Sequence, residues 1–260
     1  MNDLTLKAEV NWQARVAHAF SRAAPRYDAL ATAQRHIGEK LWGSLPPHAF
    51  NVLDMGCGTG YWTQRLAERY PNARITGLDL APGMLEQARQ RHGESIHWQP
   101  GDAATLPFGK HAFDLVFSNL AVQWCPDIGA VMEQLYRVLT PGGLAHITTL
   151  LPGTLKEVGH AWQRPEALLQ TPDRASVERA IGESGLTITR QTATVERFYY
   201  PDLKAVMASI KGVGAQIARP QASLSRNDIA AAQARFEQLR QPEGLPVSYH
   251  CLTLQLEKSL

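Results

Sequence analysis

Residues 51–60 read NVLDMGCGTG, a short apolar stretch that runs into three glycines spaced two residues apart. The apolar part predicts a buried strand, and the residues from about Tyr61 to Tyr70 have the pattern of a helix. Glycine lacks a Cβ atom, so the loop between them can turn tightly and let a ligand approach its backbone. The stretch therefore predicts a strand, a ligand-binding turn and a helix, the first unit of an α/β fold.

The same alternation of strand and helix continues through the middle of the chain. Strands are expected at residues 73–80, 95–99, 113–119 and 144–150, with helices at 82–91 and 128–139. This alternation is typical of a parallel sheet covered by helices on both faces. Later in the chain we expect a helix at 173–183, strands at 186–200 and 246–258, and helices at 202–214 and 226–239.

Two helical segments lie outside this alternating core. The first covers about residues 9–45, as helices at 9–22 and 30–45 that join at Pro25 and end at Pro46-Pro47. The second is an insertion at about 201–244 between the last two strands. We expect a single domain over residues 1–260, with the N-terminal helices as a cover and the insertion as a lid.

Composition excludes several other classes of protein. Apolar residues make up 44% of the chain, too many for a disordered protein, and the net charge of +2 argues against bulk binding of nucleic acid. No apolar run is long enough for a membrane span. The cysteines Cys57, Cys125 and Cys251 form no CxxC pair, so we expect no metal site and a reducing, cytoplasmic environment.

Carboxylates flank the glycine loop and suggest which ligand it binds. The loop glycines are Gly56, Gly58 and Gly60, and position 61, where a dinucleotide fingerprint needs glycine, is tyrosine. Asp79 ends the second strand, where its carboxylate can accept both hydroxyls of an adenosine ribose. S-adenosylmethionine (SAM) has a ribose and no pyrophosphate, and Asp54 can orient its ammonium group. The alternative is a strand-turn-helix without a ligand.

The motifs of this region resemble those of class I SAM-dependent methyltransferases. The matching segments are VLDMGCGTG, GLDLAPGMLEQAR, GDAATLPFGKHAFDLVFSNLAVQW and LYRVLTPGG. The resemblance implies a Rossmann-like, mostly parallel seven-stranded sheet with an antiparallel final strand. It also implies that Asp102 and Ala103 contact adenine, and that Asn119 and Leu120 lie near the methionine end of SAM. Met84 is expected either beside the ribose or adenine or simply in the core.

The flanking segments resemble a narrower family. VAHAFSRAAPRYDALATAQRHIGEKL, SNLAVQWC, TTLLPGTLKEVGHAW, SIKGVGA and YHCLTLQLEK are similar to the malonyl-acyl carrier protein O-methyltransferases of biotin biosynthesis. The resemblance implies methylation of the free carboxylate of malonyl-acyl carrier protein, or of malonyl-CoA, as an early step of that pathway. The Pro-Pro motif of DNA amino methyltransferases does not follow residue 119, which argues against nucleic acid as the acceptor.

This reaction needs positioning more than proton transfer. A malonyl carboxylate is ionised at neutral pH, so we expect no general base and no catalytic residue in that sense. Candidates for contact with the acceptor are Tyr27, Gln34, Trp124, Lys211, Tyr249 and His250. Each has a structural alternative: Trp124 packs the sheet edge, Tyr27 caps the N-terminal helix pair, Lys211 is solvated and His250 is a satisfied strand residue.

Basic residues gather in the two helical segments, as an acidic carrier protein would require. They are Arg15, Arg22, Arg26, Arg35, Lys40, Lys204, Lys211 and Arg219. Two other functions stay open at this point. One is methylation of a small molecule such as a quinone precursor, and the other is regulation by SAM binding without catalysis.

Overall fold

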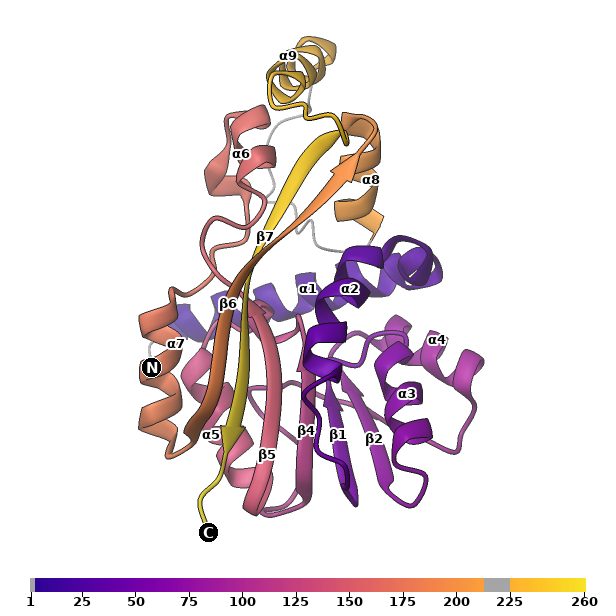
Figure 1. Ribbon diagram of the computed structural model, residues 1–260, viewed down its shortest axis with the longest axis vertical. Coiled ribbons are helices and arrows are strands. Elements are labelled where there is room, and N and C mark those ends of the chain that lie inside the picture. Colours follow the sequence, from indigo (N-terminus) through magenta and orange to yellow (C-terminus); the bar gives the residue numbers. More distant parts are fainter. Residues whose placement is uncertain (1–2, 213–224) are drawn as a thin grey trace.

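A computed structural model describes residues 3–212 and 225–260, with side chains from Trp12 onward. Within these residues, seven strands form one sheet in the order β3-β2-β1-β4-β5-β7-β6 (Figure 1). The strands are β1 (Asn51–Met55), β2 (Arg74–Asp79), β3 (His97–Pro100), β4 (Phe113–Asn119), β5 (Leu139–Leu150), β6 (Thr187–Tyr200) and β7 (Leu245–Glu257). Strands β1 to β5 pair in parallel, whereas β7 is antiparallel to both of its neighbours. The predicted fold, including the antiparallel final strand, is confirmed.

Helices cover both faces of this sheet. In the described part of the chain they are α1 (Asp3–Leu30), α2 (Thr32–Trp42), α3 (Tyr61–Arg69), α4 (Pro82–His92), α5 (Ile128–Val138), α6 (Lys156–Trp162), α7 (Arg174–Ser184), α8 (Leu203–Gly212) and α9 (Arg226–Glu237), with short 3-10 helices η1 (Val122–Trp124) and η2 (Pro165–Ala167). None of these helices is long and apolar enough to cross a membrane. Helix α6 was not predicted from the sequence.

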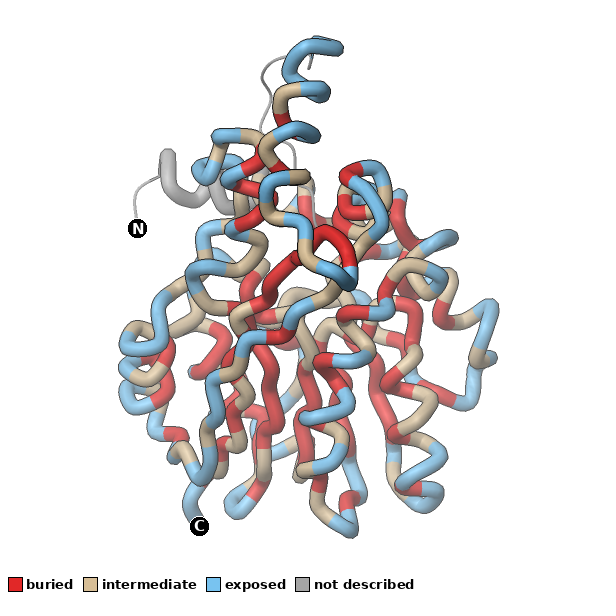
Figure 2. Tube along the Cα trace, turned by 45° about the horizontal axis from the view of Figure 1, so that its top comes forward, coloured by how far each residue is buried: buried red, intermediate tan, exposed pale blue. Residues whose placement is uncertain are grey.

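The core has two layers because side chains alternate between the faces of a strand. Val52 and Leu115 point to the side of α2 and α3, and their neighbours Leu53 and Val116 point to the side of α5 and α7. All four are fully buried. Figure 2 shows the same arrangement, with the central strands buried and the outer turns of the helices exposed.

The N-terminal helices differ from the prediction. Helix α1 continues through Pro25 to Leu30, so the predicted join at Pro25 is wrong. Pro25 cannot donate the backbone hydrogen bond that the carbonyl of Ser21 would otherwise accept. The buried Ala24 packs against α4, and this packing stabilises the helix through Pro25. The second helix ends at Trp42, before the two prolines that were expected to close it.

Strands β6 and β7 extend beyond the rest of the sheet. The pairing of β5 with β7 ends at Leu150 and Cys251, whereas β6 and β7 continue to pair up to Tyr200 and Leu245. This two-stranded extension, with α8 and α9 between its strands in sequence, rises above the main sheet (Figure 1). Part of the predicted insertion, including residues 213–215 of SIKGVGA and Arg219, lies outside the described residues.

Candidate active site

The glycine loop connects β1 to α3 at the carboxyl edge of the sheet. Gly56 has a φ of 80°, and a Cβ atom there would lie 2.2 Å from the Cβ of Ala121, so the position requires glycine. Gly58 also has a positive φ, of 56°, but a Cβ atom there would have only Tyr27 Cε1 within reach, at 4.0 Å. Tyr27 of α1 therefore lies close over the loop and covers it.

Asp79 lies beside this loop at the end of β2. Its two carboxylate oxygens accept hydrogen bonds from the backbone N–H groups of Ala81 and Gly58, both at 2.8 Å. Burial raises the pKa of Asp79 above its ordinary value, and the N–H groups of Ala81 and Gly58 oppose that rise. A carboxylate has about four acceptor sites, so the side chain is fixed in orientation and can still accept the two hydroxyls of a ribose.

Asp54 is the last residue but one of β1, just before the glycine loop, and is almost completely buried. The hydroxyl of Thr63 donates a hydrogen bond of 2.6 Å to one carboxylate oxygen. Burial raises the pKa of Asp54 from its ordinary value of 3.8 to about 7, the Thr63 hydrogen bond lowers it, and the charge of Asp79 raises it further. The carboxyl group therefore titrates near neutral pH, where a nearby cationic ligand would favour its ionised form.

The adenine side of the predicted site is covered by α1. The Nε2 amide of Gln13 donates to one oxygen of Asp102, and the backbone N–H of Ala104 donates to the other at 2.9 Å. Ala103 packs on the main core cluster beneath. Met84 is 1% exposed and packs between α4 and α1, so the structure shows its core contacts, and its contact with ribose or adenine stays a prediction.

Unpaired polar atoms gather where α2 meets the ends of β4 and β5. The Asn119 amide donates to the backbone carbonyl of Gln34 at 3.0 Å, which brings these two predicted residues together. Asn119 Oδ1 and Gln34 Oε1 are buried and without a hydrogen-bond partner. The hydroxyl of Thr148, which pairs in register with Asn119, is also buried and unpaired. Buried groups of this kind usually have a partner, so their number here indicates a ligand site.

Thr148 was missed by the sequence reading. Its signal was the pair of threonines in ITTL, at the end of an otherwise apolar strand. Polar residues at the carboxyl end of a parallel strand commonly face the ligand of an α/β fold.

Trp124 mainly holds α1 in place. Leu120 turns the chain with a φ of 54° into η1, and its N–H donates to the carbonyl of Thr148 at 2.9 Å. The ring of Trp124 lies edge-on to Phe20 at 5.3 Å, and its backbone carbonyl accepts the indole N–H of Trp12 at 2.9 Å. These contacts are with α1 and not with the edge of the sheet, and a contact of Trp124 with the acceptor stays a prediction.

Tyr27 and Tyr249 belong to the same side of the site. Burial raises the pKa of the Tyr27 hydroxyl, and so does the charge of the nearby Asp79. The pKa of Tyr249 is also raised by burial, with smaller effects from neighbours that include Tyr27. Tyr249 packs edge-on to Phe198 at 5.6 Å on the side of α2 and α8. Both hydroxyls therefore stay protonated and available as hydrogen-bond donors.

His250 does not join them. It follows Tyr249 in β7, and successive side chains of a strand point to opposite faces. Its imidazole lies next to Gly153, where a Cβ atom would be 2.9 Å from the ring, and its Nε2 atom is buried and unpaired. Tyr249 and His250 are thus separated by the sheet and do not face one common ligand.

Lys211 lies at the edge of this side, exposed on α8. The next residue, Gly212, packs so tightly on α1 that a Cβ atom there would lie 2.0 Å from Leu30 Cδ1. Lys211 is therefore carried next to the C-terminal end of α1, close to the segment that holds Tyr27. Its position fits the rim of a site better than its floor.

The geometry agrees with comparisons to known proteins. Residues 52–143 match the family described as a methyltransferase domain. A putative methyltransferase from Bacillus halodurans C-125 has a TM-score of 0.62 and 14% identity, and the alignment covers 85% of this chain and 98% of that chain. The sheet order, the glycine loop and these matches define a class I SAM-dependent methyltransferase.

Closer relatives identify the family within this class. A malonyl-[acyl-carrier protein] O-methyltransferase from Serratia marcescens is 41% identical over 245 residues, which cover 93% of this chain and 94% of the relative. The biotin biosynthesis bifunctional protein BioHC of Cellvibrio japonicus (strain Ueda107) is 38% identical over 252 residues, or 94% of this chain. The chain spans only 50% of that bifunctional relative. The chain belongs to the malonyl-[acyl-carrier protein] O-methyltransferase family.

The residues of the site fit SAM, the cofactor of this class. Asp79 is oriented for two hydroxyls, and Asp54 offers a carboxylate to a cation. The unpaired oxygen of Asn119 is a further acceptor. The individual contacts of Asp54, Gly56, Gly58, Gly60, Asp79, Met84, Asp102, Ala103, Asn119 and Leu120 with SAM stay predictions.

Proposed function

We propose that this protein methylates the free carboxylate of malonyl-acyl carrier protein, giving the methyl ester at an early step of biotin biosynthesis. The observation that carries the proposal is family membership at 41% identity over nearly the whole chain. SAM supplies an activated methyl group on a sulfonium leaving group. The protein's own part is to bind the acceptor, orient its carboxylate and exclude water.

The acceptor side is suited to a substrate that arrives already ionised. Malonyl carboxylates titrate well below neutral pH, so no proton has to be removed before the reaction. The protonated hydroxyls of Tyr27 and Tyr249 are hydrogen-bond donors, which a carboxylate needs for orientation. A neutral donor orients the nucleophile without the strong ion pair that would reduce its reactivity.

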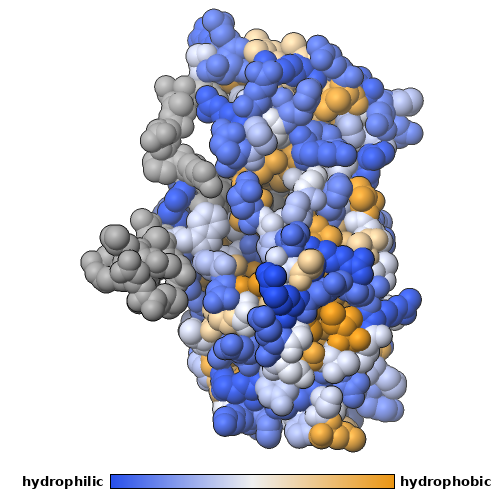
Figure 3. Space-filling view, turned by 90° about the vertical axis from the view of Figure 1, so that its left-hand side faces the viewer, coloured by the Kyte–Doolittle hydropathy of each residue, from blue (hydrophilic) through white to orange (hydrophobic). Residues whose placement is uncertain are grey.

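The outer face of α1 supports a carrier protein as the source of the malonyl group. Arg22 and Arg26 are exposed, one helical turn apart, on the side opposite Ser21, Ala24 and Asp28, which face α4. Neither arginine has an ion-pair partner among the described residues. Figure 3 shows that the side of the molecule carrying α7 is mostly hydrophilic, with hydrophobic side chains in small separate patches. A charged docking surface on α1 suits an acidic partner.

The test is mass spectrometry of malonyl-acyl carrier protein after incubation with SAM and the protein. The proposal predicts a gain of one methyl group that disappears when the malonyl group is replaced by acetyl, because acetyl has no free carboxylate. No methyl gain on the malonyl substrate would overturn the proposal. Methylation of phenols or quinone precursors instead would establish a small-molecule methyltransferase.

A second measurement concerns the carrier. The double variant Arg22→Glu and Arg26→Glu should raise KM for malonyl-acyl carrier protein by about tenfold or more and leave KM for malonyl-CoA unchanged. Equal effects on both substrates would show that α1 does not dock the carrier protein. The matched control is Arg174→Glu. Arg174 is an exposed arginine of α7 that pairs with Glu178, and its reversal should leave both KM values unchanged.

We also infer that residues 1–260 act as one methyltransferase domain, in which the N-terminal helices and the insertion both serve the site. A cytoplasmic location is supported by the cysteines, since Cys57, Cys125 and Cys251 are all free thiols.

A further inference from the structure

Helix α1 covers the expected cofactor site from above. It runs along the carboxyl edge of the sheet (Figure 1), with Gln13 bonded to Asp102 near one end and Tyr27 facing Gly58 near the other. Tyr27 lies close over Gly58, so the C-terminal half of α1 covers the glycine loop where SAM is expected to bind. That half of the helix has to move when SAM enters and when S-adenosylhomocysteine leaves.

Apolar contacts hold this half of the helix at two places, in a small cluster against α4 and where Leu30 packs on Gly212 of α8. Ala24 of α1 packs with Ala81 and Met84 in a small cluster, bordered by Phe20 and Tyr27, that is separate from the three larger core clusters. The alanines of the cluster bury little apolar surface, and the larger Met84, Phe20 and Tyr27 supply most of its packing. Polar contacts at the end of the helix add to this packing in keeping it closed.

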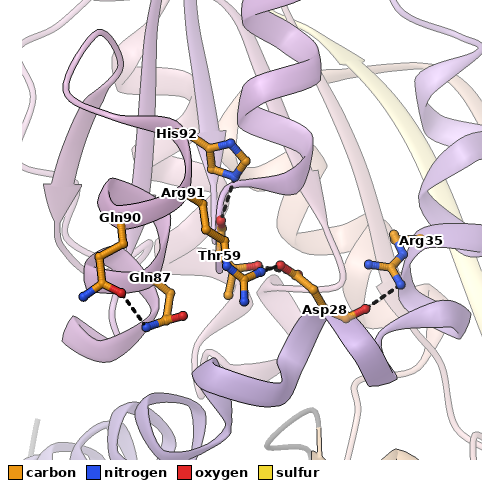
Figure 4. A network of polar contacts seen from close by, with 7 residues as sticks. All are labelled: Asp28, Arg35, Thr59, Gln87, Gln90, Arg91 and His92. Atoms are coloured by element: carbon orange, nitrogen blue, oxygen red, sulfur yellow. Dashed lines mark hydrogen bonds and ion pairs between the residues drawn. The ribbon is translucent and has the colours of Figure 1, made fainter.

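Asp28 makes the principal polar contacts there (Figure 4). One carboxylate oxygen accepts a hydrogen bond of 2.6 Å from the hydroxyl of Thr59, inside the glycine loop. The other forms an ion pair with Arg91 in the last turn of α4. The backbone carbonyl of Asp28 accepts a hydrogen bond of 2.6 Å from Arg35 on α2. One residue thus ties α1 to the cofactor loop, to α4 and to α2.

The receiving side of the junction is buried and has contacts of its own. Thr59 is 1% exposed, and its backbone carbonyl contacts His92 Nε2 at 3.1 Å. Position 28 also shares a helix face with Ser21, whose hydroxyl accepts the N–H of Gly83 at 3.1 Å, and with Ala24. The Asp28 junction is therefore the outermost contact of one continuous α1–α4 interface, and it can open first.

We propose that Asp28 is a positioning residue that latches α1 over the cofactor, and that its contacts with Thr59 and Arg91 break during each exchange of cofactor and product. The side chains of Asp28 and Arg91 are 27% and 33% exposed. Water therefore reaches both groups and can replace their contacts when the helix lifts. In the closed state the latch holds Tyr27 against the loop, and in the open state the site exchanges its ligand.

The test is the dissociation rate of S-adenosylhomocysteine, measured by stopped-flow displacement with excess SAM. Asp28→Asn keeps the size of the side chain and removes its charge, and Arg91→Met removes the cation. Each should raise the dissociation rate by about tenfold or more. The double variant should be no faster than the faster single variant, because the two changes break the same contact.

A control variant separates a specific effect on the dissociation rate from a general loss of stability. Glu178→Gln breaks an exposed Arg174–Glu178 ion pair on α7 and is the matched control, with no change expected in the dissociation rate. If Asp28→Asn fails to fold, Arg91→Met and Thr59→Val give the same measurement from the other side of the junction. Dissociation rates within a factor of about two of the parent would overturn the proposal, and so would additive effects in the double variant.

This inference rests on SAM binding and not on the identity of the methyl acceptor. Dissociation of S-adenosylhomocysteine is measured without any acceptor present. If malonyl-acyl carrier protein is not methylated, the proposed function fails and the latch is still tested by the same rates.

Discussion

Asp54→Asn should stabilise the cofactor-free protein strongly at pH 8 and much less at pH 5. The pKa of Asp54 is about 7 in the folded protein, against an ordinary value of 3.8 that applies to the unfolded chain. When folding raises the pKa of a carboxyl group, the contribution of that group to the stability of the folded protein is fully present below the pKa of the unfolded chain. That contribution is lost as the pH rises through the folded pKa of about 7. The parent protein is therefore penalised at pH 8, where Asp54 has to be ionised in a buried site.

The magnitude follows from the two pKa values. A difference of about 3 in pKa corresponds to about 4 kcal/mol at pH 8, since each pKa unit is worth about 1.4 kcal/mol. At pH 5 the folded group is already protonated, and the penalty falls to about 1–2 kcal/mol. Asparagine cannot ionise, and its carbonyl can still accept the Thr63 hydrogen bond. The stability difference between Asp54→Asn and the parent should therefore grow by about 3 kcal/mol from pH 5 to pH 8.

The assay is urea unfolding of both proteins at several pH values, with Glu178→Gln as an exposed control that should show no such growth. A difference that stays constant across this pH range would refute the argument that burial raises the pKa of Asp54. The Asp54→Asn variant should also bind SAM more weakly, because the ammonium group of SAM would then lie beside a neutral amide in place of a carboxylate. In the parent protein, SAM binding at pH 6 should release protons, which calorimetry in buffers of different ionisation enthalpy detects.

Three further predictions concern binding and stability. Asp79→Ala should weaken SAM binding by about 1.5–3 kcal/mol, since it removes a charged acceptor for the ribose hydroxyls; an unchanged affinity by calorimetry would contradict that role. Lys211→Ala should raise KM for malonyl-acyl carrier protein and leave the Kd for SAM unchanged. If KM is also unchanged, Lys211 is only a solvated residue of α8. Phe236→Ala should cost about 3–5 kcal/mol in urea unfolding, because Phe236 of α9 is fully buried in a cluster that includes α6 and the β6–β7 extension; a cost under about 1 kcal/mol would show that α9 is not part of the cooperative fold.

Local patterns made the cofactor half of the site predictable. The strand, the glycine turn and the strand-end Asp79 are set by residues close in sequence, and the structure places Asp79 Oδ2 2.8 Å from the N–H of Gly58. The alternation of strands and helices was sufficient for the parallel part of the sheet, whereas the antiparallel final strand was implied by the family resemblance. Successive side chains of a strand point to opposite faces of the sheet, so Tyr249 and His250 could be expected to face opposite sides. Naming both as contacts of one acceptor overlooked this rule.

Contacts between distant segments could not be predicted in the same way. Asp28 lies 31 residues from Thr59, and no local signal indicates that the two side chains meet. The course of α1 through Pro25 depends on packing against α4, which overrides the local preference of proline. The cluster of Gln34, Asn119 and Thr148 is likewise created by the fold, because its members come from α2, β4 and β5.

The β6–β7 extension has a consequence for the modular construction of the molecule. Tyr200 and Leu245 are direct partners in an antiparallel ladder, so the 44 residues between them leave and rejoin the sheet at adjacent points. Antiparallel strands can be joined by a turn of two residues. The β6–β7 pairing therefore sets where the segment leaves and rejoins the sheet, and the packing of α8 and α9 against other helices sets its own fold. The sheet below would keep its register if this segment changed, since every pairing of β7 with β5 lies further down the strand.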